Sequence, residues 1–495
     1  MSKSIEDWRA AAASLNIDTR PVIAGSRTVV EAEAFHTTDP WRNDTVATYP
    51  DCGAADVDRA VSAARQAFEA RTWADTPSAE RAAVLNEWAD AIETHAEALA
   101  LMDSLEMGMP ITNALDDIAY SAGLVREVAG LLTTLTAPAA NTVPGTLSQN
   151  VFEALGVVAA ITPWNFPVNQ VLTRIVPAIA MGNAVVLKPS EIAPASALYL
   201  ADLAQEAGLP NGQLSVLPGT GPVTGAALVS HSDINKIAFT GSTRTGGAIQ
   251  AMAARAGQPK PLLMELGGKS PHIVCQSFDA PEELAPVIAH NAFWNTGQVC
   301  SAGTRLIVHE SRADSLVEAL CRVTKDMQPG DPLDPATKFG PIASSKQAET
   351  VAGFVQRAKD AGLEATSGDT HSSGPVIFDR VPVDAEIARE EIFGPVLGVS
   401  RFETLDEAIA LANASAFGLV ATAWTRDLNE AHTLARKLRA GSVTVHGDAN
   451  AGGDFSPVLG LEPGGRSGFG ADYGHAGLTQ FAQLKLITFN TNAPA

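Results

Sequence analysis

Apolar and polar positions follow two different rhythms in the first third of the chain. Short β-rich runs occur between residues 21 and 48, including Pro21-Val-Ile-Ala-Gly25, and predict a hairpin at the edge of a sheet. Residues 55–135 instead repeat apolar positions at helical spacing, as from Val57 to Ala70. The chain therefore begins with a β edge and continues into a mainly helical region.

Strands and helices alternate from residue 151 to residue 240. The runs Gly156–Ile161 and Ala184–Leu187 are unbroken apolar stretches, typical of strands buried on both faces. The remaining predicted elements are strands at Leu214–Leu217 and Ile237–Phe239, a helix at Arg174–Met181, and a helix that opens at Pro194 and closes at Gly208 and Pro210. This alternation predicts a parallel, doubly wound sheet, in which ligands bind beyond the carboxyl ends of the strands.

A second alternating region spans roughly residues 266–445 and predicts a second α/β domain. Its strand-like runs are Ser270–Val274, Arg305–Val308, Val396–Val399 and Ser442–Val445. The last such run, Lys485–Phe489, has no obvious partner in its own domain. Because exposed strand edges are usually covered, we expect this run to pair with an edge elsewhere, such as one in another subunit.

Length and charge narrow the class of protein. A chain of 495 residues is too long for one core, so two or three domains are expected. The net charge of -21 disfavours nucleic acid and anionic membrane as partners. No apolar run approaches the roughly 20 residues that a membrane helix needs, and residues 1–14 contain no apolar signal core. We expect a cytoplasmic protein.

The four cysteines are Cys52, Cys275, Cys300 and Cys321. They form no CxxC pair and no zinc pattern, so no metal site is predicted. Cysteines this sparse in a long chain also favour a reducing compartment.

Six segments carry candidate chemistry: five stand at or near the ends of apolar runs, and the sixth precedes a strand-like run. They read Ile161-Thr-Pro-Trp-Asn-Phe-Pro167, Leu187-Lys-Pro-Ser-Glu191, Phe239-Thr-Gly-Ser-Thr-Arg-Thr-Gly246, Met264-Glu-Leu-Gly-Gly-Lys-Ser270, Gly297-Gln-Val-Cys300 and Glu390-Glu-Ile-Phe-Gly-Pro395. In order and spacing they resemble the signature segments of the aldehyde dehydrogenase superfamily, over roughly residues 20–490. Within it the chain looks most like the γ-glutamyl-aminobutyraldehyde and aminoaldehyde branch.

The resemblance implies an α/β fold with two doubly wound domains and a small β oligomerisation element. Residues 1–132 and 154–265 correspond to the dinucleotide-binding domain, and residues 266–466 to the catalytic domain. Residues 133–153 and 467–495 correspond to the oligomerisation element and the C-terminal tail. Members of the family assemble as homodimers or homotetramers, and their partners are small aldehydes.

Three residues are the catalytic candidates. A lone Cys300 is more often an inert core cysteine, but the resemblance places the family's nucleophile there, and a thiolate attacks carbonyl carbons well. Glu265 matches the base that activates water, and an apolar setting would raise its pKa toward neutrality. Its structural alternative is a salt bridge to Lys269. Asn165 either braces a turn or, as in the family, donates to the oxyanion.

The loop Gly241–Gly246 is a weak dinucleotide signal by itself, since it is neither GxGxxG nor a P-loop. Small residues before a helix still let a pyrophosphate approach the helix N-terminus. The resemblance assigns this contact to Ser242, the adenine ribose to Lys188 and Glu191, and the nicotinamide end to Glu391 and Phe393. The other cofactor candidates are Trp164, Ser190, Gly221, Gly241, Gly246 and Leu266. We expect NAD as cofactor, with NADP as the alternative.

The resemblance also locates a substrate tunnel. Its lining residues are Asp117, Tyr120, Asn169, Gln170, Thr173 and Trp294. They are largely polar, which favours an aldehyde carrying an amine over a long alkyl chain; the alternative is that Asp117 caps a turn. Ser456–Gly468 departs from the family pattern, since it is longer and has Val458 in place of a Phe.

Other functions remain open at this point. The substrate could be an aromatic aldehyde or a semialdehyde oxidised by the same mechanism. An acylating dehydrogenase that uses coenzyme A typically lacks the residue matching Glu265. A non-catalytic protein on this fold would not need Cys300, Glu265 and Asn165 together, and a thiol esterase would not need the dinucleotide segments.

Overall fold

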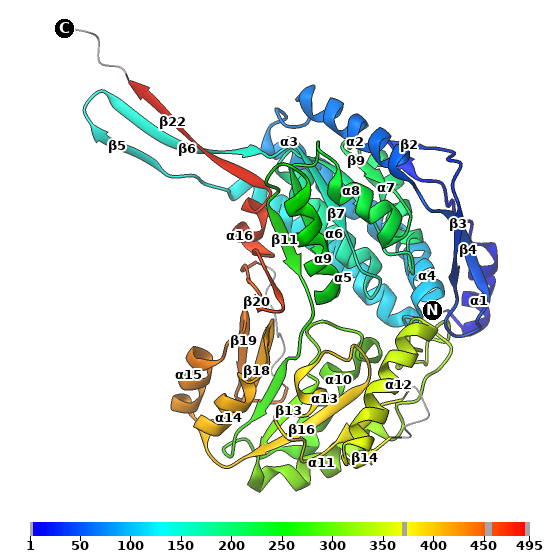
Figure 1. Ribbon diagram of the computed structural model, residues 1–495, viewed down its shortest axis with the longest axis vertical. Helices are drawn as coiled ribbons and strands as arrows, with labels where there is room; N and C mark the ends of the chain where they lie inside the picture. Colours follow the sequence, from blue (N-terminus) through cyan, green and yellow to red (C-terminus); the bar gives the residue numbers. More distant parts are fainter. Residues whose placement is uncertain (1–2, 369–373, 451–457, 491–495) are drawn as a thin grey trace.

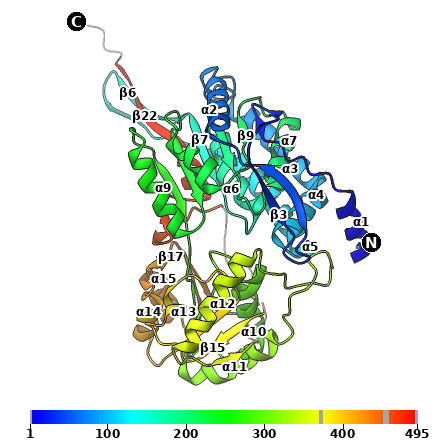
Figure 2. The ribbon, with the colours of Figure 1, turned by 45° about the vertical axis from the view of Figure 1, so that its right-hand side comes forward.

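Two α/β lobes and a projecting β arm make up the molecule (Figures 1 and 2). The computed structural model describes residues 3–368, 374–450 and 458–490. None of the helices in these ranges is long and apolar enough to cross a membrane.

The first lobe is built on an eight-stranded sheet. In spatial order its strands are β2 (Ser26–Arg27), β1 (Val22–Ile23), β9 (Leu214–Val216), β8 (Ala184–Lys188), β7 (Val157–Ile161), β10 (Lys236–Thr240), β11 (Leu262–Glu265) and β21 (Gly468–Phe469). The strands from β9 to β11 are parallel, and β1 and β21 pair antiparallel at the two sides. The predicted doubly wound sheet and the edge hairpin of β1 and β2 are confirmed.

Alternate residues of the central strands enter separate cores on the two faces of this sheet. On β7, Val158 and Ala160 face one core, while Val157 and Ala159 face the other. Helices α3 (Ser78–Thr94), α4 (Ala96–Met107), α5 (Ile111–Thr134), α6 (Pro167–Ala180) and α7 (Ala195–Glu206) cover the first face. Helices α2 (Ala54–Glu69), α8 (Ala226–Ser230) and α9 (Thr243–Arg255) cover the second.

Helix α6 begins earlier than the sequence predicts. It starts at Pro167 rather than at Arg174, because a proline is well accommodated in the first turn of a helix, where its missing N–H needs no partner. The polar residues Asn169, Gln170 and Thr173 are therefore helical.

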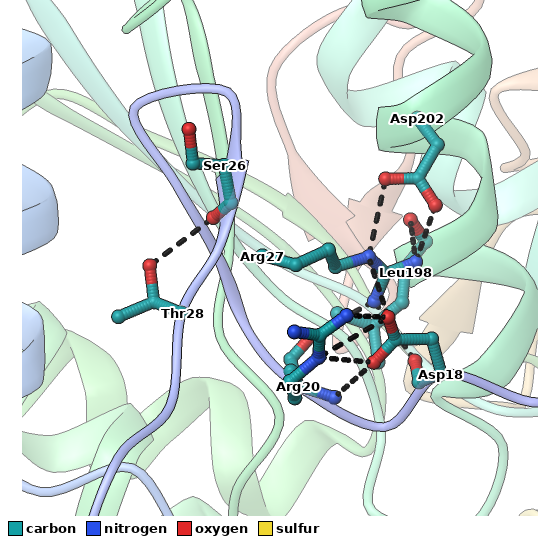
Figure 3. A network of polar contacts seen from close by, with 7 residues as sticks. All are labelled: Asp18, Arg20, Ser26, Arg27, Thr28, Leu198 and Asp202. Atoms are coloured by element: carbon teal, nitrogen blue, oxygen red, sulfur yellow. Dashed lines mark hydrogen bonds and ion pairs between the residues drawn. The ribbon is translucent and has the colours of Figure 1, made fainter.

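An arginine anchors the N-terminal hairpin to α7 (Figure 3). The guanidinium of Arg27 pairs with Asp202 at 2.5 Å and donates to the carbonyl oxygens of Leu198 and Asp18 at 3.1 and 2.8 Å. The preceding segment contains α1 (Ile5–Ser14), and the following one contains the two-stranded sheet of β3 (Ala34–Thr38) and β4 (Thr45–Pro50).

The second lobe contains a seven-stranded sheet, which confirms the second α/β region. Its strands in order are β14 (Ala365–Ser367), β15 (Val376–Phe378), β16 (Val396–Phe402), β13 (Arg305–His309), β12 (Pro271–Val274), β18 (Val420–Trp424) and β19 (Ser442–His446). The surrounding helices are α10 (Pro281–Phe293), α11 (Glu310–Thr324), α12 (Ser345–Asp360), α13 (Glu386–Arg389), α14 (Leu405–Ala412) and α15 (Leu428–Lys437). The short strands β17 (Phe417–Gly418) and β20 (Gly464–Gly465) pair beside it.

The C-terminal strand has a partner in its own chain, which corrects the expectation from sequence. β22 (Ala482–Asn490) pairs antiparallel with β6 (Thr146–Ala154) along its whole length, and β6 pairs with β5 (Ala139–Val143). The partner lies more than 300 residues away along the chain, so no local pattern indicates it. These strands form the arm of Figure 1, and α16 (Gly474–Thr479) lies at its base.

Candidate active site

The carboxyl edge of the first sheet gathers four of the six candidate segments. Ile161 at the end of β7 lies opposite Lys188 on β8 and Phe239 on β10, and Thr240 lies opposite Glu265 on β11. The loops that follow these strands therefore leave the sheet side by side, where ligands bind in open parallel sheets.

Cys300 follows a strained turn. Asn295, Thr296 and Gly297 all have left-handed backbones, with φ of 48°, 59° and 70°. This conformation is unfavourable for a β-branched residue such as Thr296, whose hydroxyl is held by the carbonyl oxygen of Gly340 at 2.9 Å. Strain of this kind is retained where surrounding contacts fix it, commonly at functional sites.

Asn165 is tied to the same turn. Its side-chain amide donates to the carbonyl oxygen of Gln298 at 2.9 Å, and the amide of Asn295 donates to the carbonyl oxygen of Asn165 at 2.8 Å. The Asn165 amide, only 4% exposed, thus lies against the residue two positions before Cys300.

Gly268 brings the Glu265 segment against Cys300. A Cβ atom on Gly268 would lie 2.0 Å from the carbonyl oxygen of Cys300, so only glycine permits this approach. Burial, and then the charges of Glu265 and Glu391, raise the pKa of the Cys300 thiol to about 12. The thiol is therefore protonated at neutral pH before substrate binds.

Glu265 ends β11 and is 7% exposed. Its Oε1 has no hydrogen-bond partner in the described ranges, and no ion pair with Lys269 occurs in them. Burial, and next the carboxylate of Asp472, raise the pKa of Glu265 well above its ordinary value, while Arg174 opposes the shift. Burial is the largest cause of this rise, in the direction that an apolar setting predicts.

Sequence reasoning missed the buried ion pair of Arg174 and Asp472, whose charges act on Glu265. Arg174 on α6 is 1% exposed and Asp472, which follows β21, is 5% exposed. The two residues are 298 positions apart, so nothing in the local sequence points to this pairing.

Glu391 and Phe393 lie on the second lobe beside the glycine pair. Glu391 accepts from the backbone N–H of Gly268 at 2.9 Å, and burial raises its pKa to about 7. Phe393 has a left-handed backbone and packs edge-on against Trp164, with ring centroids 5.5 Å apart. Gln347 on α12, which sequence reasoning also missed, donates to the carbonyl oxygens of Ile392 and Phe393 at 3.1 and 2.8 Å.

The loop before α9 has the features of an anion-binding helix terminus. Ser242 is the N-cap and accepts from the N–H of Thr245 at 3.2 Å, and the first turn contains no acidic residue. Cβ atoms on Gly241 and Gly246 would lie 2.6 Å from Phe239 and Leu266, respectively. Small residues are therefore required here, as for close approach of a phosphate.

Lys188 and Glu191 lie together beyond β8. The Lys188 ammonium donates to the carbonyl oxygen of Pro189 at 2.6 Å and lies 3.4 Å from the Glu191 carboxylate. Lys188 is buried, whereas Glu191 is half exposed. Ser190 accepts from the N–H of Ile192 at 3.2 Å, and Gly221 begins a short π-helical turn whose last residue, Gly225, lies next to the Lys188 side chain.

The predicted tunnel residues fall into two groups. Asp117, Asn169 and Thr173 are buried between α5 and α6, with Asn169 donating to Ser121 at 3.2 Å. Asp117 accepts from the backbone N–H of Asn169. The other group, Tyr120, Gln170 and Trp294, is at least partly exposed.

Aromatic packing and a small hollow surround the predicted tunnel residues. Trp294 packs between Phe166 and His290, with centroid distances of 5.0 and 6.0 Å. Thr173 lines a small hollow together with Asp472 and Tyr473. Of the divergent segment Ser456–Gly468, Ser456 and Pro457 lie outside the described residues, and Val458 is exposed.

Comparison with known proteins identifies close relatives. The model of the aldehyde dehydrogenase family matches residues 28–487. The chain is 42% identical over 492 residues to the NADP/NAD-dependent aldehyde dehydrogenase PuuC of Escherichia coli, and 36% identical over 495 residues to an aminoacetaldehyde dehydrogenase of Pseudomonas aeruginosa, each match covering 98% of both proteins.

Solved structures show the same similarity. The γ-glutamyl-γ-aminobutyraldehyde dehydrogenase of Burkholderia cenocepacia superposes with a TM-score of 0.94 at 37% identity, covering 99% of this chain and 100% of that one. The P. syringae indole-3-acetaldehyde dehydrogenase, in complex with NAD+ and IAA, gives the same TM-score, identity and coverage.

Proposed function

The chain belongs to the aldehyde dehydrogenase family, and we propose that it oxidises an aldehyde to the carboxylic acid with NAD, through a thioester on Cys300. The observation that carries this proposal is the convergence of three groups. The Asn165 amide binds the Gln298 carbonyl, and Gly268, three residues after Glu265, packs on the carbonyl of Cys300.

The first half of the reaction forms a bond to sulfur. The Cys300 sulfur attacks the aldehyde carbon, and the thiol proton passes to a neighbouring carboxylate; Glu265 and Glu391 are the ones whose charges reach it. The Asn165 amide turns from the Gln298 carbonyl to donate to the new oxyanion, a contact commonly worth about 2.7–4 kcal/mol.

The residues beyond the first sheet fit a dinucleotide. The α9 terminus and its two constrained glycines suit a pyrophosphate. On the second lobe, the charge of Glu391 acts on Cys300 and Phe393 packs on Trp164. When bound, NAD supplies the hydride acceptor. Loss of hydride from the thiohemiacetal carbon leaves a thioester on Cys300.

Glu265 then completes the reaction as the base for hydrolysis. Burial raises the pKa of the Glu265 carboxyl, which makes its carboxylate a stronger base toward water than an exposed carboxylate. Hydroxide adds to the thioester, the thiolate leaves, and the acid is released. We assign to Arg174 and Asp472 the role of positioning residues that set the proton affinity of Glu265.

We propose an aminoaldehyde as the substrate. The buried carboxylate of Asp117 keeps Oδ2 without a hydrogen-bond partner among the described residues, and a substrate ammonium would supply one. The names of two relatives, aminoacetaldehyde dehydrogenase and γ-glutamyl-γ-aminobutyraldehyde dehydrogenase, support this substrate class.

Replacement of the nucleophile tests the proposal. We expect Cys300→Ala to lower the rate of NADH formation by at least about a thousand-fold while NAD binding, followed by fluorescence, is retained. The matched control is Cys321→Ala, because Cys321 is a partly exposed thiol on α11 away from the site. Substantial turnover by Cys300→Ala, or NADH formation by wild type only when coenzyme A is added, would reject the mechanism.

A further inference from the structure

A small cavity, with room for about one water-sized group, lies behind the segment that links Glu265 to the second lobe. Its walls come from that segment, from the start of β13, from the end of α14 and from the residues around β17 and β18. Leu419 lines the cavity and approaches the glycine that packs on Cys300, so the cavity and the active site share this wall.

Two polar side chains in this wall are buried without a partner. Lys269 is 2% exposed and Ser270 is 3% exposed. Neither the Lys269 ammonium nor the Ser270 hydroxyl has a hydrogen-bond partner among the residues that the structure describes. A buried ammonium with no partner is costly, so such a pair of donors points to a bound group.

The charged residues around the cavity indicate the charge of the bound group. Lys269, Arg305 and Arg439 line the cavity, and none of its lining residues is acidic. Arg305 is buried and donates to the carbonyl oxygens of Lys269, Leu411 and Ala412 at 2.7, 3.0 and 2.9 Å. Among the described residues, its guanidinium forms no ion pair with a carboxylate. The positive lining disfavours a cation, and the size of the cavity excludes any group much larger than a water molecule or a halide.

We propose that this cavity binds one small monovalent anion, of the size of a halide, between the Lys269 ammonium and the Ser270 hydroxyl. The partly exposed Asn413 and the exposed Arg439 provide the access side. The anion holds the segment after Gly268 in place, because both of its donors belong to that segment. This site is separate from the substrate and dinucleotide sites proposed above and does not depend on them.

Anion binding is linked to proton uptake. Burial, and next the charge of Arg305, lower the pKa of Lys269 to about 7, while Glu391 and Glu390 oppose the shift. Glu391 also titrates near pH 7, and its deprotonation adds negative charge close to the site. Both changes weaken anion binding as the pH rises from 6 to 9, whereas Arg305, whose pKa burial lowers to about 10, stays mostly charged over this range.

The test compares chloride and bromide with gluconate at constant ionic strength. At pH 6 we expect halide to raise the melting temperature of the whole enzyme saturably, by about 2 °C at 100 mM, and to do so less at pH 9. Lys269→Met should abolish the rise. The matched control is Lys260→Met, since Lys260 is buried but donates to Val229 and His231 carbonyls, and it should keep the rise.

A crystallographic arm locates the anion. Bromide-soaked wild-type crystals should give an anomalous peak within hydrogen-bond distance of Lys269 and Ser270, and Ser270→Ala should weaken halide binding about three- to tenfold. If Lys269→Met fails to fold, the bromide peak and the halide affinity of Ser270→Ala test the proposed site without it. The proposal would be overturned if the cavity held only water, or if gluconate raised the melting temperature as much as halide does. It would also be overturned if halide raised the melting temperature of Lys269→Met as much as that of the wild type.

Discussion

At the residue scale, burial sets the protonation state of the groups around Cys300. The pKa values of the Cys300 thiol and of the Glu265 and Glu391 carboxyls are all raised, with burial as the largest cause. Sequence reasoning could anticipate this for Glu265, because an apolar run precedes it. It could not anticipate the contribution of Asp472, which reaches the site from the far end of the chain.

Asp117 is the residue that most directly reports on substrate class. Burial raises the pKa of its carboxyl to about 7, so the carboxylate forms as the pH rises through 7. We expect Asp117→Asn to lower kcat/KM for an aminoaldehyde by about tenfold, or roughly 1.4 kcal/mol, and to leave propanal almost unchanged. In the wild type, kcat/KM for the aminoaldehyde relative to propanal should rise between pH 6 and 8.

Equal losses for both aldehydes would instead show that Asp117 only supports α6 through its bond to the Asn169 N–H. A wild-type preference for benzaldehydes or long alkanals would reject the aminoaldehyde proposal.

Glu191 is expected to set the cofactor preference. Its half-exposed carboxylate lies beyond β8, where it would repel a 2′-phosphate, although Lys188 at 3.4 Å offsets part of that charge. We expect the wild type to prefer NAD, and Glu191→Gln to narrow the ratio of kcat/KM for NAD over NADP by about tenfold. Glu206→Gln, at the exposed end of α7, should leave the ratio unchanged. An equal wild-type efficiency with both cofactors contradicts the assignment.

At the scale of elements, the sequence predicts strands well and unusual turns poorly. The run at Ala184–Leu187 becomes a strand because continuous apolar sequence suits burial on both faces. The run at Ser442–Val445 alternates polar and apolar residues and becomes a partly buried strand at the edge of the second sheet. The left-handed turn at Asn295–Gly297 has no such signal, since Thr296 disfavours that backbone and only its bond to Gly340 and the surrounding packing hold it.

The β arm is the element for which we propose a role in homo-oligomerisation, as a dimer or tetramer. Its strand β22 pairs within the chain but is an outer strand of the arm's sheet. Several large apolar side chains of the arm are exposed: Val143, Leu147, Leu484, Leu486 and Phe489. An exposed apolar sheet of this kind is typical of a protein–protein contact surface.

Light scattering should therefore give a mass at least twice the chain mass of 51.5 kDa. Leu486→Asp, which places a charge on a 67% exposed apolar position, should shift the protein toward smaller species. Lys485→Gln, on the opposite face of the same strand, should not. A wild-type mass of one chain would refute the proposal.

At the scale of the whole molecule, the two lobes contribute different halves of the site. Asn165 follows β7 and Glu265 ends β11 in the first sheet, whereas Cys300 and Glu391 belong to the second lobe. The segment from Glu265 to Pro271 passes between them and touches both Cys300 and Glu391. The sequence indicates the Glu265, Cys300 and Glu391 segments separately. Only the fold shows that Gly267 and Gly268 let the Glu265 segment approach the other two. The domain boundaries drawn from the resemblance stay predictions.

The most direct test of the mechanism is a rapid-mixing experiment on Glu265→Gln. Hydride transfer does not need this base and deacylation does, so we predict a burst of about one NADH per active site followed by slow turnover. Mass spectrometry of the quenched enzyme should show an acyl adduct on Cys300. If the burst is absent, or if steady-state turnover equals that of the wild type, Glu265 is not the base that hydrolyses the thioester.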